Sequence, residues 1–154
     1  MQIKKIKSLA LGGMIAALYA GITIALAPIS YGVLQFRAAE ALTLLPFYIP
    51  EAVPGLFVGC LVANAASPNG ALDMVVGSLA TLAAACLSRR MPRLWLAVLP
   101  PVLVNMAAIG TMLHYVADVP LWSTIFYVGI EQTIACALGI PLMKTLEKLK
   151  LVKR

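Results

Sequence analysis

Positive charge is confined to three short clusters, and this pattern constrains the fold of the chain more than any other feature. Every one of the twelve Lys and Arg residues except Arg37 lies in residues 4–7, 89–93 or 144–154, and long apolar stretches separate these clusters. Basic residues concentrate in the cytoplasmic segments of membrane proteins. The clusters therefore predict a membrane protein whose two termini and centre face the cytoplasm, with an even number of crossings between them.

Composition supports a place in lipid. The chain is 62% hydrophobic, well above the apolar share of an average soluble domain. Its net charge of +6 does not indicate nucleic-acid binding, because the basic residues flank apolar spans without interleaved aromatic residues. Anionic lipid headgroups explain the charge better. The first apolar stretch has no small-residue cleavage site, so we expect a retained helix and not a signal peptide.

The apolar stretches predict six membrane helices. A run of about 20 apolar residues crosses the hydrocarbon core. Pro50 and Pro54 split the second stretch, which leaves two short tilted helices or one re-entrant pair. The sequence thus predicts one all-α, polytopic domain over residues 1–154, with both termini cytoplasmic. The expected helices cover residues 8–27, 38–49, 52–66, 72–88, 94–113 and 121–143.

Three cysteines, Cys60, Cys86 and Cys136, lie within apolar sequence. Their odd number implies no disulfide framework, and we expect buried packing residues. The sequence also lacks a phosphate-binding loop and the His and Cys spacing of a metal site. We therefore expect no enzyme activity, no metal and no cofactor in this chain, and any energy for its function must come from elsewhere.

Polar residues inside the apolar stretches predict a binding pocket that opens outward. Five of the six acids, Glu40, Glu51, Asp73, Asp118 and Glu131, lie within or at the ends of membrane segments, where ionisable groups are costly and usually functional. The topology places Glu131 near the middle of the bilayer. It places the following residues in the outer half: Asn64, Asp73, Asn105, His114, Tyr115, Asp118, Trp122 and Tyr127.

Each of these residues has a structural interpretation beside the functional one. Glu131 follows Tyr127 by one turn on the same helix face, and either binds a ligand or is satisfied by another helix. Asn105 either binds ligand or joins helices through its amide. Asp73 either caps its helix or enters the pocket. Arg37 and Glu40, spaced i and i+3, are expected to form a structural ion pair.

Residues near the ends of the expected helices have simpler interpretations. His114, Tyr115 and Trp122, with Asp118, are typical interfacial anchors, although an aromatic lid over a planar ligand is an alternative. Glu51 is expected to order a turn on the cytoplasmic side.

Small residues recur every four positions in the first helix. This spacing lets a second helix approach closely. The spacing does not tell whether the partner helix lies in this chain or in another subunit, although packing within the chain is more common. The two rows are Gly12, Ala16 and Ala20, and Gly13, Ala17 and Gly21.

Taken together, these features resemble the substrate-binding S components of energy-coupling factor transporters. Six short helices, cytoplasmic termini, small residues in helix one and an outward pocket carry this resemblance. Longer strings are similar to the QueT family of predicted importers of queuosine precursors, and the similarity covers nearly the whole chain. These strings are YGVLQFR at 31–37, EALTLLP at 40–46, PEAVPG at 50–55 and LHY at 113–115.

The resemblance implies a membrane subunit in a prokaryotic cell membrane that captures a 7-deazaguanine from outside. Its implied partners are one transmembrane coupling protein and two ATPases, on which it docks through the small residues of helix one before toppling in the membrane. Glu131 would then accept two hydrogen bonds from the ring, and Asn105 or Asn64 would read its carbonyl and ring nitrogen. Trp122, Tyr127 or Tyr115 would stack on the ring, Asp73 would bind an ammonium group, and residues 28–36 would form a lid.

Two other functions fit the sequence. A self-contained carrier or channel would use Glu131, Glu40 and His114 as a proton relay. A membrane scaffold would use the polar groups only to join helices.

Overall fold

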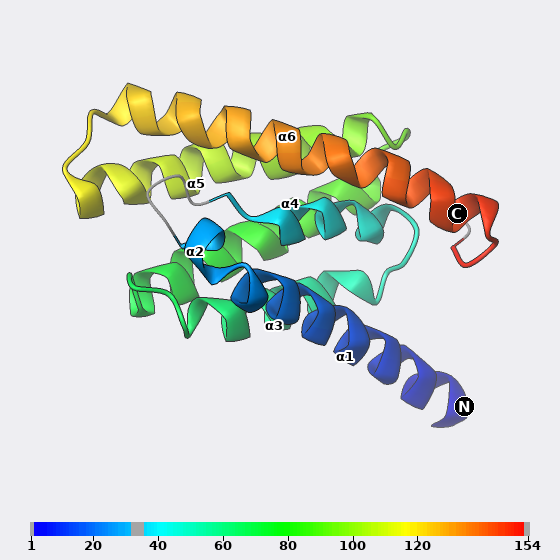
Figure 1. Ribbon diagram of the computed structural model, residues 1–154. Coiled ribbons are helices and arrows are strands. Elements are labelled where there is room, and N and C mark those ends of the chain that lie inside the picture. The colour runs from blue at the N-terminus through cyan, green and yellow to red at the C-terminus, as the bar shows by residue number, and fades with distance from the viewer. Residues whose placement is uncertain (1, 32–35, 153–154) are drawn as a thin grey trace.

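The computed structural model describes residues 2–31 and 36–152, and all regular secondary structure in this part of the chain is helical (Figure 1). Its helices and helical turns, in chain order, are α1 (Gln2–Ala25), α2 (Ala27–Ser30), η1 (Ala38–Phe47), α3 (Ala52–Asn64), η2 (Asp73–Gly77), α4 (Ser78–Arg90), η3 (Leu96–Val98), α5 (Leu99–Ala117) and α6 (Leu121–Lys148). The expected all-α class is confirmed for these residues.

Within the described part of the chain, three helices are long and apolar enough to cross a membrane. They span Gln2–Ala25, Leu96–Ala117 and Leu121–Lys148, while η1 and α3 are apolar but shorter. At 1.5 Å per residue, the 13 residues of α3 extend only about 20 Å. The structure therefore confirms apolar spans but leaves the predicted count of six crossings, and the orientation of the termini, as predictions.

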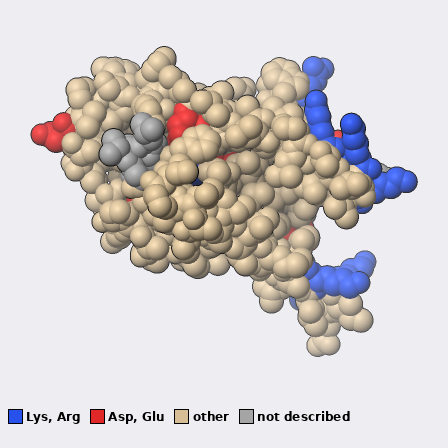
Figure 2. Space-filling model, in the orientation of Figure 1, with Lys and Arg blue, Asp and Glu red and all other residues tan. Residues whose placement is uncertain are grey.

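The basic clusters lie together in space although they are far apart in sequence. In Figure 2 the Lys and Arg side chains on the face in view gather at one end of the molecule, where Figure 1 places both termini. The side chains of Arg89 and Arg90, at the end of α4, are exposed. This arrangement agrees with the expectation that all three clusters share one side of the membrane.

Helix η1 forms the centre of the molecule and differs most from its prediction. The segment 38–49 was expected to be a short membrane helix, but residues 38–47 form a 3₁₀ helix in which eight of ten residues are buried. Runs of this length are uncommon in 3₁₀ geometry. Pro46 removes one backbone donor inside it. Helix α6 passes so closely that a Cβ at Gly139 would overlap the Ala41 carbonyl oxygen.

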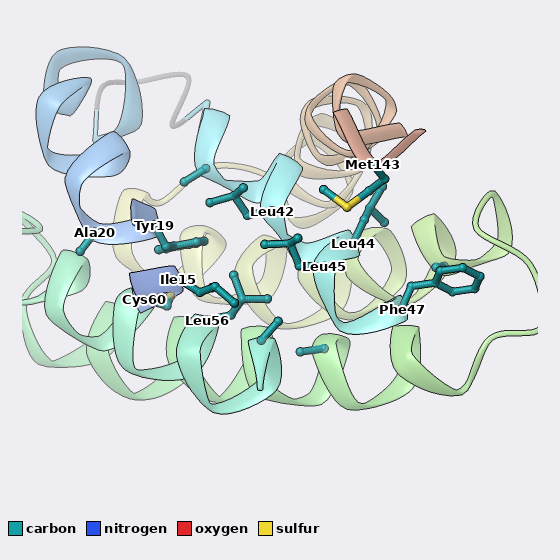
Figure 3. Packing of buried hydrophobic residues seen from close by; sticks show 14 of the residues in the cluster. Ile15, Tyr19, Ala20, Leu42, Leu44, Leu45, Phe47, Leu56, Cys60 and Met143 are labelled. Carbon is teal, nitrogen blue, oxygen red and sulfur yellow. The ribbon is translucent and has the colours of Figure 1, made fainter. Parts of the chain in front are cut away.

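The apolar core surrounds η1. Leu42, Leu44 and Leu45 of η1 pack with Ile15 of α1 and Leu56 of α3, as Figure 3 shows. Burial of Leu or Ile side chains is worth roughly 1.5–3 kcal/mol each. The core therefore fixes η1 between the helices, and this position decides where the polar residues at its start, Arg37 and Glu40, are held.

The two rows of small residues on α1 face different surroundings. A Cβ at Gly55 or Gly59 of α3 would lie 2.7 Å from the carbonyl oxygen of Gly12 or Ala16, respectively. The row that begins at Gly12 therefore packs on α3 within this chain. A Cβ at Gly13 or at Gly21 meets no atom within 4 Å. The partner left open by the sequence is thus α3 for the first row, and only the second row remains on the surface.

All three cysteines are free, as expected. Cys60 and Cys136 are buried, but Cys86 is exposed on the outer face of α4, so its prediction as a buried residue was wrong. In a membrane helix, apolar residues adjacent in sequence do not show whether a side chain faces the protein interior or the lipid.

Candidate binding site

A small cavity lies between η1, the start of α4, and the facing halves of α5 and α6. Its volume of about 30 Å³ leaves room for roughly two water molecules. Polar side chains from four segments, η1 with its N-cap, α4, α5 and α6, converge on it. They are Arg37, Glu40, Thr81, Asn105, Tyr127, Glu131 and Gln132, and the remaining lining residues are Gly77, Ile109, Leu113 and Val128.

Glu40 is held by donors from two other helices. The Tyr19 hydroxyl of α1 donates to Oε1 of Glu40, and Nε2 of Gln132 in α6 donates to Oε2 at 3.0 Å. Glu40 is 3% exposed and Tyr19 is fully buried. Because both oxygens have donors, the carboxylate is a fixed acceptor that joins η1 to α1 and α6.

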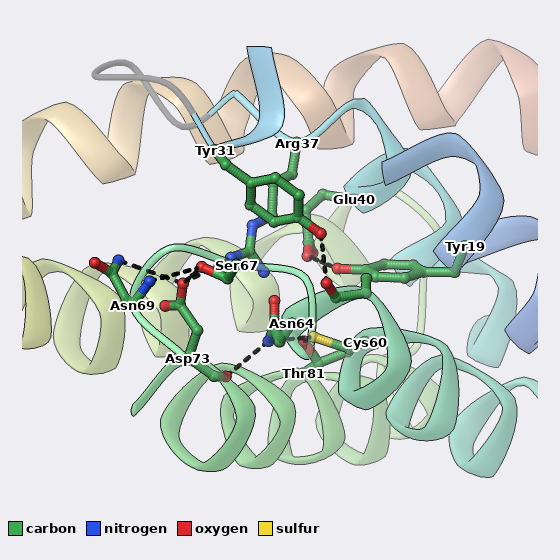
Figure 4. Close-up of polar contacts among 11 residues, drawn as sticks. Tyr19, Tyr31, Arg37, Glu40, Cys60, Asn64, Ser67, Asn69, Asp73 and Thr81 are labelled. Carbon is green, nitrogen blue, oxygen red and sulfur yellow. Dashed lines mark hydrogen bonds and ion pairs between the residues drawn. The ribbon is translucent and has the colours of Figure 1, made fainter. Parts of the chain in front are cut away.

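Arg37 connects the cavity to a second buried acid. Its Nη2 lies 3.8 Å from Oδ2 of Asp73, and its guanidinium lies 6.0 Å from the centre of the Tyr31 ring (Figure 4). Its backbone N–H donates to Oε1 of Glu131 at 3.0 Å. The expected ion pair between Arg37 and Glu40 is therefore wrong. Arg37 precedes η1 with an extended backbone (φ −98°, ψ 93°), so its side chain does not share the helix face of Glu40. The Glu40 carboxylate instead contacts Tyr19 and Gln132, and the guanidinium extends toward Asp73.

Asp73 belongs to a polar cluster behind Arg37. Its Oδ2 accepts from the Ser67 hydroxyl and from Nδ2 of Asn69 at 3.3 Å, while its backbone carbonyl accepts from Nδ2 of Asn64 at 2.7 Å. Asp73 and Asn64 are both fully buried. Asp73 Oδ1 and Asn64 Oδ1 are buried without a hydrogen-bond partner among the described residues, which is unusual for polar atoms inside a protein.

A π-helical turn, η2, puts Asp73 in this position. Residues 73–77 widen the first part of the helix that continues as α4, and such turns are frequent at functional sites. A Cβ at Gly77 would overlap the amide nitrogen of Asn64. Glycine at this position therefore lets the Asn64 side chain lie against the turn and reach the Asp73 carbonyl.

The structure brings together most of the residues that the sequence singled out. Five of them, Arg37, Glu40, Asn105, Tyr127 and Glu131, line the cavity, and Asp73 and Asn64 lie behind Arg37. Asp73 lies in the first turn of its helix, as expected, and its side chain also accepts from Ser67 and Asn69 ahead of it.

The residues at the α5–α6 hairpin do not line the cavity. Tyr115 and Trp122 are each 80% exposed. The His114 ring nitrogen Nδ1 contacts the Val119 carbonyl at 2.6 Å, and Asp118 ends α5 in the left-handed conformation with φ 53°. This placement suits the interfacial interpretation better than stacking on a ligand in the cavity.

Other residues of the site were not singled out in the sequence. Tyr19, Gln132 and Thr81 belong to it, with Ser67 and Asn69 behind them. Gln132 was detectable as an amide beside Glu131 within an apolar helix. Tyr19 carries no such signal, because tyrosine is common near membrane interfaces.

The residues proposed for partner docking divide between two faces. Gly12, Ala16 and Ala20 belong to the row that packs on α3, whereas Gly13, Ala17 and Gly21 are exposed. Glu51 accepts from the Ser8 hydroxyl at 3.1 Å and so fastens the start of α3 to α1, in agreement with its expected role at a turn. Of the segments carrying the resemblance, YGVLQFR and the proposed lid at 28–36 include residues 32–35, which lie outside the described residues.

Chemically, the site is a small, acid-rich recognition pocket. Carboxylates and amides supply paired acceptors and donors that suit a planar polar ring. No group of three His, Cys, Asp or Glu side chains among residues 2–31 and 36–152 is arranged to hold a metal ion.

Comparison with known proteins gave one family and one curated relative. Residues 9–148 match the family model described as QueT transporter. The relative, the queuosine precursor transporter QueT of Lactococcus lactis subsp. cremoris (strain MG1363), is 37% identical over 71 residues. The aligned part is 45% of this chain and 41% of the relative, less than half the length of each. No solved structure matches the chain.

Proposed function

The chain belongs to the QueT transporter family, and from this premise we propose that it captures a queuosine precursor, a 7-deazaguanine, outside the cell and delivers it inward. Family membership makes it a transporter and not an enzyme. Family membership and the long apolar helices support a multi-pass membrane protein, which we place in a prokaryotic plasma membrane. The queuosine precursor is proposed as the substrate because the name of the relative states it. The transport mechanism is also part of the proposal.

The observation that carries the proposal is the position of Glu131. Its side chain lines the cavity, is 9% exposed, and is oriented by the backbone N–H of Arg37. A guanine-like ring offers two adjacent donors, N1–H and the exocyclic amine, which match the two oxygens of a carboxylate. Asn105 lines the same cavity and can donate from its amide to the ring carbonyl.

The ring needs more space than the cavity now provides. A deazaguanine is several times larger than two water molecules, so binding must move side chains that line the cavity. Tyr127 lines the cavity and is 37% exposed. We assign it to the ring face, ahead of Tyr115 and Trp122, which do not line the cavity.

Delivery would depend on partner subunits. The proposal includes six membrane crossings with cytoplasmic termini, docking on a transmembrane coupling protein with two ATPases, and toppling of the loaded subunit. The exposed row Gly13, Ala17 and Gly21 supports a docking face, because a partner helix can approach it closely. Ala17→Leu should lower uptake in cells while ligand binding is retained. Ala137→Leu, at an exposed position on α6, is the matched control.

Thermal stabilisation of the purified protein in detergent tests the capture step. A ligand at 100 times its dissociation constant stabilises the folded state by roughly 2.7 kcal/mol. We expect stabilisation by 7-aminomethyl-7-deazaguanine, its 7-cyano analogue or queuine, and none by riboflavin. Guanine, which lacks the 7-substituent, serves as a second control. Folded protein that responds to no deazapurine would contradict the proposal.

The excess of buried acids also favours a second function, a proton-coupled carrier. Glu40 and Glu131 both line the cavity, but His114 does not, so the relay considered from the sequence lacks its third member. Substrate uptake into vesicles that contain this chain alone, driven by a proton gradient, would support the carrier. A pure scaffold would show neither uptake nor stabilisation by ligand.

A further inference from the structure

Negative charge exceeds positive charge in the buried part of the site. Three acids, Glu40, Asp73 and Glu131, surround a single base, Arg37, and all four residues are at most 9% exposed. Ionised groups without partners are costly in a protein interior. With every acid ionised, the cluster has two negative charges more than Arg37 can balance.

The hydrogen bonds do not supply the missing positive charge. Glu40 accepts from the neutral Tyr19 and Gln132, and Asp73 accepts from the neutral Ser67 and Asn69. Neutral donors stabilise a carboxylate but leave its charge in place. With its three acids ionised, the cluster is therefore complementary to a cation that is not part of the described chain.

Arg37 is a poorly fitted partner for Asp73. The distance of 3.8 Å between Nη2 and Oδ2 is about 1 Å longer than a good charge-assisted hydrogen bond. Among residues 2–31 and 36–152, the other carboxylate oxygen, Oδ1, has no hydrogen-bond partner, and neither does Oδ1 of Asn64, whose amide nitrogen contacts the Asp73 backbone. Two buried acceptors, one of them on the carboxylate, thus remain open within the described part of the chain to a donor that carries positive charge.

The guanidinium lies between these acceptors and the cavity. Arg37 lines the cavity, and its Nη1 lies 3.9 Å from the position of a Cβ on Gly77, in the turn that carries Asp73. Figure 4 shows the side chain extending toward Ser67 and Asp73. Movement of this one side chain would open a path from the cavity to Asp73.

We propose that the site selects deazaguanines that carry a protonated amine on the 7-substituent, and that this amine takes the place of the Arg37 guanidinium at Asp73. The proposal rests on the proposed function, because the ring must first bind beside Glu131. In the empty site the Arg37 guanidinium occupies the position beside Asp73 and closes the path from the cavity. When the ligand binds, its ammonium group replaces the guanidinium beside the buried carboxylate.

A pair of ligands that differ in this charge tests the proposal. Dissociation constants for 7-aminomethyl-7-deazaguanine and for the neutral 7-cyano analogue are measured by calorimetry on the full chain in detergent. The wild-type protein should bind the aminomethyl form at least tenfold more tightly. Asp73→Asn should reduce this preference at least fivefold while the affinity for the cyano form is kept. Glu51→Gln, an acid-to-amide change away from the cavity, should leave the preference unchanged.

A second variant covers the case in which Asp73→Asn does not fold. Arg37→Gln removes the competing cation and should tighten binding of the aminomethyl form several-fold, with little change for the cyano form. Equal affinity of the wild-type protein for the two ligands would overturn the inference, and so would a preference that survives in folded Asp73→Asn. In both cases the proposed function stands. Binding of neither ligand would overturn the inference and the proposed function together.

Discussion

Two groups of residues that the sequence singled out as candidate ligand contacts lie in opposite environments. The buried group around Arg37 includes Glu40 and Glu131, each at most 9% exposed, whereas Tyr115 and Trp122 at the α5–α6 hairpin are 80% exposed. The first group is enclosed because η1 brings its start into the middle of the bundle. The comparison teaches that a residue's position along a membrane helix does not by itself place it in a binding site. Other segments must also pack around that residue.

The largest difference between the two groups should appear in stability when a tyrosine hydroxyl is removed. Tyr19→Phe leaves one oxygen of the buried Glu40 carboxylate without its donor, which costs about 2–3 kcal/mol for a hydrogen bond to a charged group. Tyr115→Phe, on the exposed side, should change stability by less than about 0.5 kcal/mol. Denaturant unfolding in detergent micelles measures both, and equal effects would break the comparison.

A smaller difference in stability is expected between a closely packed glycine of α3 and an exposed glycine of α1. Gly59→Ala places a methyl group 2.7 Å from the Ala16 carbonyl oxygen, so overpacking should cost about 1–2 kcal/mol. Gly21→Ala adds a methyl group in open space on the same pair of helices, and its higher helix propensity should make it neutral or stabilising by up to about 1 kcal/mol.

The same unfolding assay measures this contrast. Destabilisation by Gly21→Ala equal to that by Gly59→Ala would show that the exposed row is covered within the folded chain.

The smallest expected effects concern ligand affinity. Asn105→Ala removes one neutral hydrogen bond to the ring, worth about 1 kcal/mol, and should weaken binding about fivefold. Trp122→Ala should change the dissociation constant less than about twofold, since Trp122 does not line the cavity. Calorimetric titration compares them. A larger loss from Trp122→Ala than from Asn105→Ala would move the site to the hairpin.

The long helices could be predicted from the sequence because their signals are local. The expected spans 8–27, 94–113 and 121–143 overlap α1, α5 and α6. Helices α1 and α6 extend several residues further into their basic flanks, whereas α5 begins at Leu99 and ends at Ala117, each a few residues later than expected. The 3₁₀ helix η1 and the π-turn η2 could not, because contacts from other segments impose them. The approach of Gly139 to Ala41 is one such contact, and the side chain of Asn64 against Gly77 is another.

Residues of the candidate site could be predicted where they are polar side chains within an otherwise apolar helix. Glu131 and Asn105 stand out for that reason, and both line the cavity. The pairing of Arg37 was not predictable, since i, i+3 spacing places two side chains on one face only when both residues are helical. Arg37 precedes η1 with an extended backbone (φ −98°, ψ 93°), and its guanidinium reaches Asp73 of η2, 36 positions along the chain. The hydroxyl of Tyr19 gave no local signal at all.

The central claim is that the enclosed acidic cavity, and not the hairpin, binds the deazaguanine. The most direct test compares the dissociation constant of 7-aminomethyl-7-deazaguanine for two acid-to-amide variants, Glu131→Gln and Asp118→Asn, with that of the wild-type protein. Glu131→Gln replaces one of the two acceptor oxygens by a donor and should weaken binding more than tenfold, whereas Asp118→Asn should leave it unchanged. Wild-type affinity in folded Glu131→Gln, or a loss confined to Asp118→Asn, would contradict the assignment.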